Sequence, residues 1–167
     1  MKKIAIALFA LALPQFSWGQ LIFFEAHLDG AQAGVASPGT GFASGTVDIS
    51  SFLFTLDYTF TGMLAPQTAA HIHRGAPGVN GPVVIGAPSF PLGSPVHYTT
   101  TVNAGLVNDL LNNNLYLNVH SQLFRGGEIR GQLVAVPEPS TYALAGAAIL
   151  GVMIVHRRRR ARSTANA

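Results

Sequence analysis

Residues 46–61, TVDISSFLFTLDYTFT, alternate apolar and polar side chains over most of their length. The apolar members are Val47, Ile49, Phe52, Phe54, Leu56, Tyr58 and Phe60. Successive side chains of a β-strand point to opposite faces, so a period of two is typical of a strand that is buried on one side. The stretch therefore predicts a half-buried antiparallel strand, and its phenylalanines are expected to belong to a hydrophobic core.

Shorter segments on both sides carry similar signals. Predicted strands cover residues 21–28, 70–73, 83–85, 96–102, 115–120 and 128–134, with glycine and proline between many of them. These two residues end strands and form turns. Residues 34–45 are rich in Gly, Ser and Pro and indicate a loop. Residues 104–111 follow Asn103, a suitable N-cap, and have apolar residues on one side, which predicts one short helix.

The part of the chain between its two ends is expected to form a single domain. Residues 20–135 can bury one modest core, but they are too few for two. The sequence of 167 residues contains no cysteine, which excludes disulfide scaffolds, thiol catalysis and cysteine-based zinc sites. Seven or so short strands with one short helix predict an all-β fold, either an antiparallel sandwich or a barrel.

The N-terminus has the pattern of a secretory signal peptide. Lys2 and Lys3 precede an apolar stretch at residues 4–13, and Pro14 follows it. Ser17 and Gly19 supply small residues at the two positions that signal peptidase reads. We predict a signal peptide at residues 1–19, cleavage after Gly19 and export of the protein.

The C-terminus combines three features in a fixed order. Pro137, Glu138 and Pro139 precede an apolar run at residues 142–155, and a basic cluster follows. The cluster comprises Arg157, Arg158, Arg159 and Arg160. Arginines that close an apolar helix stay on the cytoplasmic side of a membrane, so this helix would form a transmembrane segment of known orientation.

Residues 136–167 resemble the PEP-CTERM sorting signal that exosortase recognises in Gram-negative bacteria. The resemblance implies that an exosortase-like membrane protease processes the tail, after a transient stay in the inner membrane. The protein would then reach the cell surface or the extracellular matrix. A permanent single-pass anchor is the alternative, although fourteen apolar residues fall short of the ~20 that span a bilayer comfortably.

The positive charge of the chain belongs to these two ends. The formal net charge is +3, but residues 20–135 contain only three arginines against six acidic residues, which leaves the domain at −3. A nucleic-acid partner is therefore not expected.

Polar residues alternate with apolar ones in three segments of the predicted domain. His71 and His73 are two apart and share a strand face. Tyr116, Asn118 and His120 form a second polar face, and Glu128, Arg130 and Gln132 form a third. If residues 115–120 and 128–134 form a hairpin, one register pairs His120 with Glu128, Asn118 with Arg130 and Tyr116 with Gln132. These segments would then contribute to a single polar face.

The same segments resemble the signature blocks of the CHRD domain, a module first named in chordin. The blocks are Ala70–Gly75 with Gly78–Pro82, Leu115–His120 and Gly127–Gln132, and the strand Phe24–Gly30 fits more loosely. The family implies an Ig-like β-fold for residues 20–135. It implies no activity, because its bacterial members have none that is agreed. The loop at residues 34–40 departs from the family pattern.

Two interpretations of the polar residues remain open. His71, His73 and His120, with Glu128 as a further candidate, offer nitrogen and carboxylate ligands suited to Zn²⁺ or Cu²⁺. The His-x-His strand is similar in outline to Cu/Zn superoxide dismutase, but that enzyme's remaining ligands and disulfide have no counterparts here. Alternatively, the residues form a hydrogen-bonded network in which Glu128 and Arg130 make an ion pair.

These interpretations lead to two functional hypotheses. In the first, the protein is a non-enzymatic surface or matrix module without a cofactor, and Asn118, Glu128 and Arg130 belong to the face that binds an exopolysaccharide or a surface protein. In the second, it is an exported metal-binding protein or metalloenzyme that holds Zn or Cu at His71, His73 and His120. We expect no catalytic residues, since a serine nucleophile motif such as Gly-x-Ser-x-Gly is absent.

Overall fold

The computed structural model describes residues 21–87, 89–137, 146–154 and 156. The predicted signal peptide lies outside the described residues. So do Glu138, Pro139 and the four arginines 157–160 of the predicted sorting signal.

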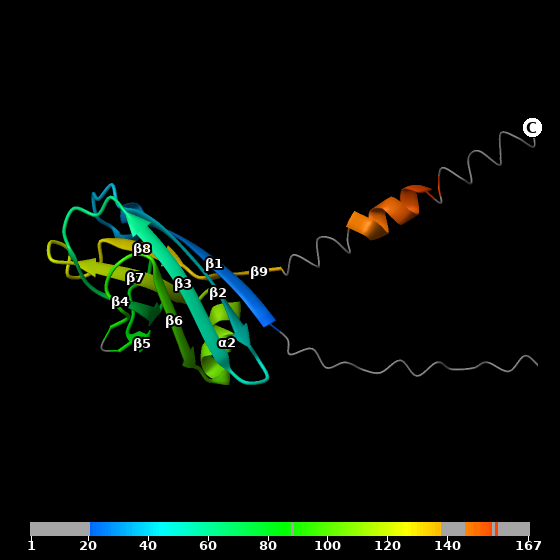
Figure 1. Cartoon of the computed structure of the whole chain (residues 1–167), viewed down its shortest axis with the longest axis horizontal. Coiled ribbons are helices and arrows are strands. Elements are labelled where there is room, and N and C mark those ends of the chain that lie inside the picture. Colours follow the sequence, from blue (N-terminus) through cyan, green and yellow to red (C-terminus); the bar gives the residue numbers. More distant parts are fainter. Residues whose placement is uncertain (1–20, 88, 138–145, 155, 157–167) are drawn as a thin grey trace, which may run out of the picture.

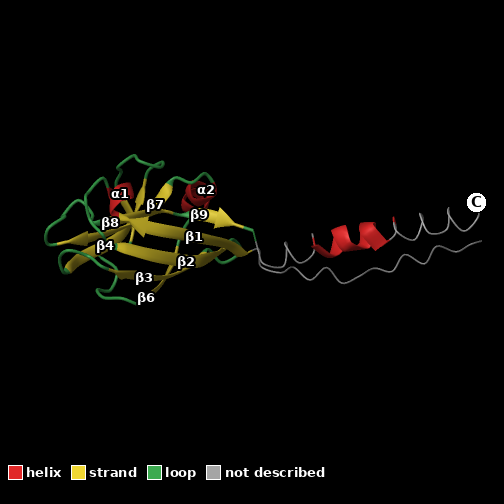
Figure 2. Cartoon of the chain, turned by 90° about the horizontal axis from the view of Figure 1, so that it is seen from above, coloured by secondary structure: helices red, strands yellow, loops and turns green. Residues whose placement is uncertain are grey.

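The described domain is built on one curled antiparallel sheet of nine strands (Figure 1). The strands are β1 Leu21–Asp29, β2 Thr40–Asp48, β3 Leu53–Thr61, β4 Gln67–Arg74, β5 Val83–Ile85, β6 Val96–Thr101, β7 Leu115–Ser121, β8 Ile129–Gln132 and β9 Val134–Val136. Their order across the sheet is β5-β4-β7-β8-β1-β2-β3-β6, and β9 pairs with β1. Figure 2 shows β1, β2 and β3 side by side along the domain. The predicted antiparallel β-fold is confirmed, in the form of a half-barrel.

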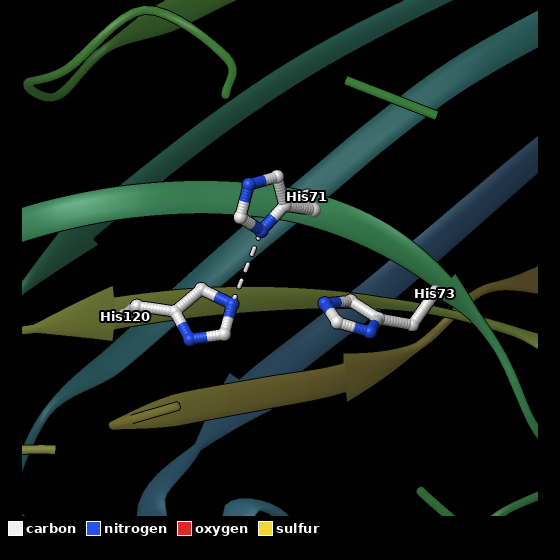
Figure 3. A group of neighbouring side chains, drawn as sticks. All are labelled: His71, His73 and His120. Atoms are coloured by element: carbon white, nitrogen blue, oxygen red, sulfur yellow. Dashed lines mark hydrogen bonds between the residues drawn. The ribbon is translucent and has the colours of Figure 1, made fainter. Parts of the chain in front are cut away.

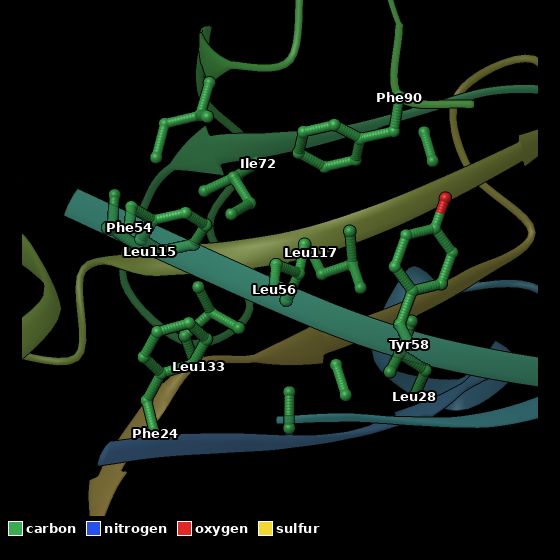
Figure 4. Packing of buried hydrophobic residues seen from close by; sticks show 14 of the residues in the cluster. Phe24, Leu28, Phe54, Leu56, Tyr58, Ile72, Phe90, Leu115, Leu117 and Leu133 are labelled. Atoms are coloured by element: carbon green, nitrogen blue, oxygen red, sulfur yellow. The ribbon is translucent and has the colours of Figure 1, made fainter. Parts of the chain in front are cut away.

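The curled sheet encloses the hydrophobic core. Leu56 and Tyr58 of β3 lie in one cluster with Ile72 of β4 and Leu117 of β7 (Figure 4). Aromatic rings fill the larger gaps, and the rings of Phe24 and Phe54 stack with centroids 5.1 Å apart. Burial of such side chains is the main force that a domain without disulfides has available.

The stretch at residues 46–61 forms two strands instead of the single strand predicted. β2 ends at Asp48 and β3 begins at Leu53, which is its partner in the ladder. The Asp48 carboxylate accepts hydrogen bonds from the backbone N–H groups of Ser50 and Ser51, and this closes a tight turn. Asp and Ser favour such turns because their side chains bond to nearby backbone groups.

The predicted loop at residues 34–45 is also partly wrong, because its second half belongs to β2. Gly41 and Gly45 are strand residues there. A Cβ atom on Gly45 would lie 2.1 Å from the Thr55 carbonyl oxygen, so glycine permits a close approach of β2 and β3. Composition alone indicated a loop where the packing requires glycine within a strand.

The predicted helix is confirmed as α2, Ala104–Leu111, and the Asn103 side chain accepts a hydrogen bond from the Leu106 N–H at 3.0 Å. A four-residue helix, α1 Gly30–Ala33, was not predicted. The predicted strand at residues 128–134 divides at Leu133 into β8 and β9. Both pair with β1, and β8 also pairs with β7.

The described C-terminal residues 146–154 are helical. Within the described parts of the chain, no helix is both long enough and apolar enough to cross a membrane.

Candidate metal centre

The hairpin of β7 and β8 has the register that the sequence predicts. Tyr116 pairs with Gln132, and Asn118 pairs with Arg130. The Glu128 N–H donates to the Val119 carbonyl at 2.8 Å, which continues the same ladder. The polar residues of both strands therefore share one face of the sheet, opposite the face that packs on the core.

β4 lies on the other side of β7 and brings two histidines to this face. In the ladder His73 pairs with Tyr116, His71 pairs with Asn118, and Ala69 pairs with His120. His71, His73 and His120 therefore become neighbours although 47 residues separate the last two in the chain. Figure 3 shows the three imidazole rings turned toward one another.

The three rings present one nitrogen each to a common region. The three ligand atoms lie within 4.8 Å of one another, and His71 Nδ1 is 3.2 Å from His120 Nε2. Nitrogen ligands about 2.0–2.1 Å from a tetrahedral Zn²⁺ ion are roughly 3.4 Å apart. The His71–His120 pair already has nearly that spacing, whereas the widest pair, up to 4.8 Å apart, would have to close by as much as about 1.4 Å.

Backbone carbonyl groups fix the tautomers of two of the rings. His73 Nδ1 lies 2.9 Å from the Gly81 oxygen, and His120 Nδ1 lies 2.8 Å from the Arg125 oxygen. Because a carbonyl only accepts, each Nδ1 must carry the proton, and each Nε2 carries a lone pair. The lone pair of His120 Nε2 faces His71 Nδ1 and can accept a hydrogen bond from it. His73 Nε2 is buried and has no hydrogen-bond partner in the described structure. A carbonyl behind a histidine ring is the usual outer support of a metal ligand.

The environment also favours neutral rings. Burial lowers the pKa of His73, and the nearby charges of His71 and Arg130 lower it further, against the opposing effect of the bond to Gly81. Burial lowers the pKa of His120 in the same way. Both rings are therefore mainly neutral at pH 7, which is the form that binds a metal ion.

Arg130 does not form the ion pair with Glu128 that the network interpretation expected. Its guanidinium carbon lies 3.4 Å from the centre of the Tyr116 ring. The guanidinium also donates hydrogen bonds to the Ala76 and Val79 carbonyls and to the Asn80 side chain. Within the described residues no carboxylate lies within salt-bridge distance of it.

Glu128 lies apart from the three histidines. Its carboxylate accepts hydrogen bonds from the Ser37 hydroxyl at 2.8 Å and from the Leu64 N–H. Burial alone would raise the pKa of Glu128, but hydrogen bonds, the strongest of them from Ser121, outweigh burial and hold the pKa below its usual value. The group of candidate ligands contains the three histidines without Glu128.

The polar residues that were proposed as a binding face are buried. Asn118 and Arg130 are each 4% exposed and Glu128 is 0% exposed. The reason is that Gly126 and the loop at residues 75–82 lie against this face of the sheet and accept its hydrogen bonds. The period-two pattern identifies a polar face but does not show whether loops cover it.

Sequence reasoning missed the residues that support the histidines. Gly81 and Arg125 act through backbone carbonyls, which no side-chain pattern can reveal. The glycines at 75, 78 and 81 were the available signal. A Cβ atom on Gly81 would lie 1.7 Å from the Arg74 oxygen, so this position has no room for a side chain.

Two family models match the chain. The one described as the CHRD domain matches residues 24–133, and the one described as the PEP-CTERM protein-sorting motif matches residues 135–160. Searches of curated proteins and of solved structures gave no match. The CHRD match includes all three histidines, and the second match begins within β9.

Proposed function

Because the chain belongs to the CHRD-domain family and continues into a PEP-CTERM sorting motif, we propose that it is an exported surface protein whose β-domain binds a transition-metal ion. The ligands are His71, His73 and His120. The observation that carries this proposal is the convergence of three imidazole nitrogens, two of them on rings whose Nδ1 atoms are held by carbonyl groups.

The buried lone pair of His73 is the strongest single element. A buried polar atom without a partner is costly, and native structures usually explain each one by a bound group or a function. A metal ion placed between the rings would satisfy His73 Nε2 and would replace the hydrogen bond between His71 Nδ1 and His120 Nε2.

The donor set favours copper or zinc. Neutral imidazole suits both ions, and Cu²⁺ binds more tightly than Zn²⁺ to most nitrogen sites. Three protein ligands leave a coordination position for water or another small ligand, as in zinc sites that are not purely structural. The expectation that the protein is not an enzyme stays a prediction, to be tested by activity assays of the metal-loaded protein.

Metal analysis of the purified protein tests the proposal. We expect about one Cu or Zn ion per chain after metal addition and gel filtration, together with a melting temperature that falls when a chelator is added. His73→Ala and His120→Ala should abolish stoichiometric binding. His27→Ala, which changes an exposed histidine on β1, is the matched control and should bind like the wild type. Absence of metal, with melting that a chelator does not change, would overturn the proposal.

The sorting motif supports the proposal of export and surface location. PEP-CTERM signals are processed by exosortase, so we propose that signal peptidase releases residues 1–19 and that an exosortase-like protease processes the tail beyond Val136. The tail helix would anchor the protein in the inner membrane until then. Mass spectrometry of the surface-released protein tests both steps through its termini. Released protein that retains arginines 157–160 would contradict exosortase processing.

A second candidate function is a matrix module that binds an exopolysaccharide or a surface protein. A specific observation favours it: an open groove of about 580 Å³ on the outer face of β1, β2 and β3. Its lining includes Phe23, Glu25, Ser44, Thr46 and Asp57, and this mixture of aromatic, hydroxyl and carboxylate groups suits a sugar chain. Asn118, Glu128 and Arg130 are too deeply buried to form such a surface.

A pull-down with purified exopolysaccharide would test this second function. Glu25→Ala combined with Asp57→Ala should lower retention if the groove is the binding surface. If the double variant is retained as well as the wild type, the groove is not the binding surface. If the wild type itself is not retained, the polysaccharide is not the ligand.

A further inference from the structure

The loop at residues 75–82, between β4 and β5, supports His73 through a single atom. That atom is the Gly81 carbonyl oxygen, which accepts a hydrogen bond from His73 Nδ1–H at 2.9 Å. Six of the eight residues in this loop are Gly, Ala or Pro, so their side chains supply no polar contacts of their own. The position of Gly81, and with it the orientation of the His73 ring, depends on groups outside the loop.

Arg130 supplies three of the hydrogen bonds that hold this loop from outside. Four others involve the Tyr116 hydroxyl, the Gln132 side chain and the backbones of Arg74 and Asn114. The Arg130 guanidinium donates to the Val79 carbonyl at 3.0 Å and to the Ala76 carbonyl at 3.2 Å. It also donates to the Asn80 side chain at 3.2 Å. A planar guanidinium can hold several oxygens in a fixed arrangement, which a flexible lysine cannot do.

Tyr116 completes the arrangement. β7 lies between β4 and β8, so His73 and Arg130 approach Tyr116 from the two strands beside it. The His73 ring is nearly parallel to the Tyr116 ring, with centroids 5.1 Å apart, and the Arg130 guanidinium lies over the Tyr116 ring. The Tyr116 hydroxyl accepts a hydrogen bond from the Gly81 N–H at 3.1 Å. Arg130 and Tyr116 thus hold both the loop and the ring of His73.

We propose that Arg130 is a positioning residue for the metal centre: it fixes the loop at residues 75–82, so that Gly81 keeps His73 Nε2 directed at the other two histidines. The inference rests on the proposed metal site. Arg130 is buried and has no carboxylate partner in the described structure, so it does not serve to neutralise an acidic side chain. Its proposed role is to hold the loop in place.

The direction of the effect separates positioning from simple electrostatics. Arg130 carries a positive charge near the site, and a positive charge repels a metal cation. If charge were its only influence, removal of Arg130 would tighten metal binding. If Arg130 positions His73, its removal should weaken metal binding despite the relief of repulsion.

Metal affinity of Arg130→Met and Arg130→Lys tests the proposal. We expect both variants to bind Cu²⁺ about tenfold more weakly than the wild type, the lower end of the range for outer supports of a metal ligand. Arg130→Lys retains the charge and loses only the planar contacts. Arg74→Met is the matched control, because the Arg74 side chain is next to His73 in the sequence but pairs with Asp109. The Cu²⁺ affinity of this variant should differ from that of the wild type by less than twofold. Unchanged or tighter binding by Arg130→Met would overturn the proposal.

A second measurement separates failure of this inference from failure of the metal proposal. In the metal-free protein, ¹⁵N NMR of the imidazoles reports which nitrogen carries the proton. Arg130→Met should mix the tautomers of His73 and leave those of His120 unchanged, because His120 is held by Arg125. A His73 spectrum identical to the wild type would overturn the positioning role, whether or not the wild type binds metal.

Tyr116→Phe provides a milder test if Arg130 variants do not fold. It keeps the stacked ring and removes only the acceptor for the Gly81 N–H. We expect about threefold weaker Cu²⁺ binding, as for loss of one neutral hydrogen bond. An affinity equal to the wild type would contradict the arrangement of Gly81 described above.

Discussion

Replacement of Glu128 by Gln should destabilise the domain, although Glu128 is not one of the proposed metal ligands. The carboxylate is 0% exposed and joins Ser37 and the backbone of Leu64 to the strand face. Hydrogen bonds to a charged group contribute about 1.5–3 kcal/mol each. The amide oxygen of Gln retains one acceptor without the charge, so we expect a loss of about 2 kcal/mol. For a domain of this size that corresponds to a decrease in Tm of roughly 8 °C.

The pH dependence of this loss provides a stricter test. The pKa of Glu128 is lowered from 4.5, so its contribution is complete above pH 4.5 and decreases as the pH falls through the pKa of the folded protein. Urea unfolding of the wild type and of Glu128→Gln should therefore differ most near pH 7, and the difference should narrow below pH 4.5. Glu25→Gln, an exposed carboxylate on β1, should change the free energy of unfolding by less than about 0.5 kcal/mol. A Glu128→Gln variant as stable as this control at pH 7 would show that the buried carboxylate does not stabilise the fold.

Three further predictions concern the core and the helix. Burial raises the pKa of Tyr58 from 10.0 to about 12, so the hydroxyl proton is lost at a lower pH from the unfolded chain than from the folded protein. The free energy of unfolding should therefore fall by about 2.7 kcal/mol between pH 10 and 12. Tyr58→Phe should remove this decrease. Gly45→Ala should lower the free energy of unfolding by about 3 kcal/mol in chemical denaturation, because the new Cβ would lie 2.1 Å from the Thr55 oxygen. Gly126→Ala is the control: its Cβ meets no atom within 4 Å, and the free energy of unfolding should hardly change. Asn103→Ala should lower the free energy of unfolding by about 1 kcal/mol and Asn103→Ser should restore it, since both effects depend on the N-cap; equal stability of the two variants would contradict this.

Strand positions could largely be predicted from the sequence, and strand boundaries could not. β5 and α2 have the predicted bounds, and the β7–β8 register agrees with the alternation of polar residues. The division at Asp48 was missed because the alternation of apolar residues continues on both sides of a four-residue turn. The division at Leu133 was missed because the pairing with β7 ends there while the pairing with β1 continues, and the loss of one neighbouring strand leaves no mark on local composition.

In the candidate site, too, some features could be predicted from the sequence and others could not. His71 and His73 could be chosen from their spacing, since alternation along a strand places them on one face, and His120 from its place on a second alternating strand. Their meeting depends on the pairing of β4 with β7, which the sequence does not show. Glu128 belongs to the same pattern but bonds to Ser37 and Leu64, which lie far from it in the sequence. Alternation specifies a face; it does not specify which partner a side chain meets on that face.

The export and sorting signals, the antiparallel β-class and the polar strand faces that carry His71 with His73 and, on another strand, His120 could all be predicted from the sequence. These depend on local order along the chain: charge next to apolar length, and a period of two. Folding adds the pairing of β4 with β7 that joins these faces, the loops that cover them, the separation of Glu128 from Arg130, and the Gly81 and Arg125 carbonyls that orient two of the rings. The physical reason is that long-range contacts and backbone acceptors are created by folding, when strands distant in the sequence are brought together and loops close over them.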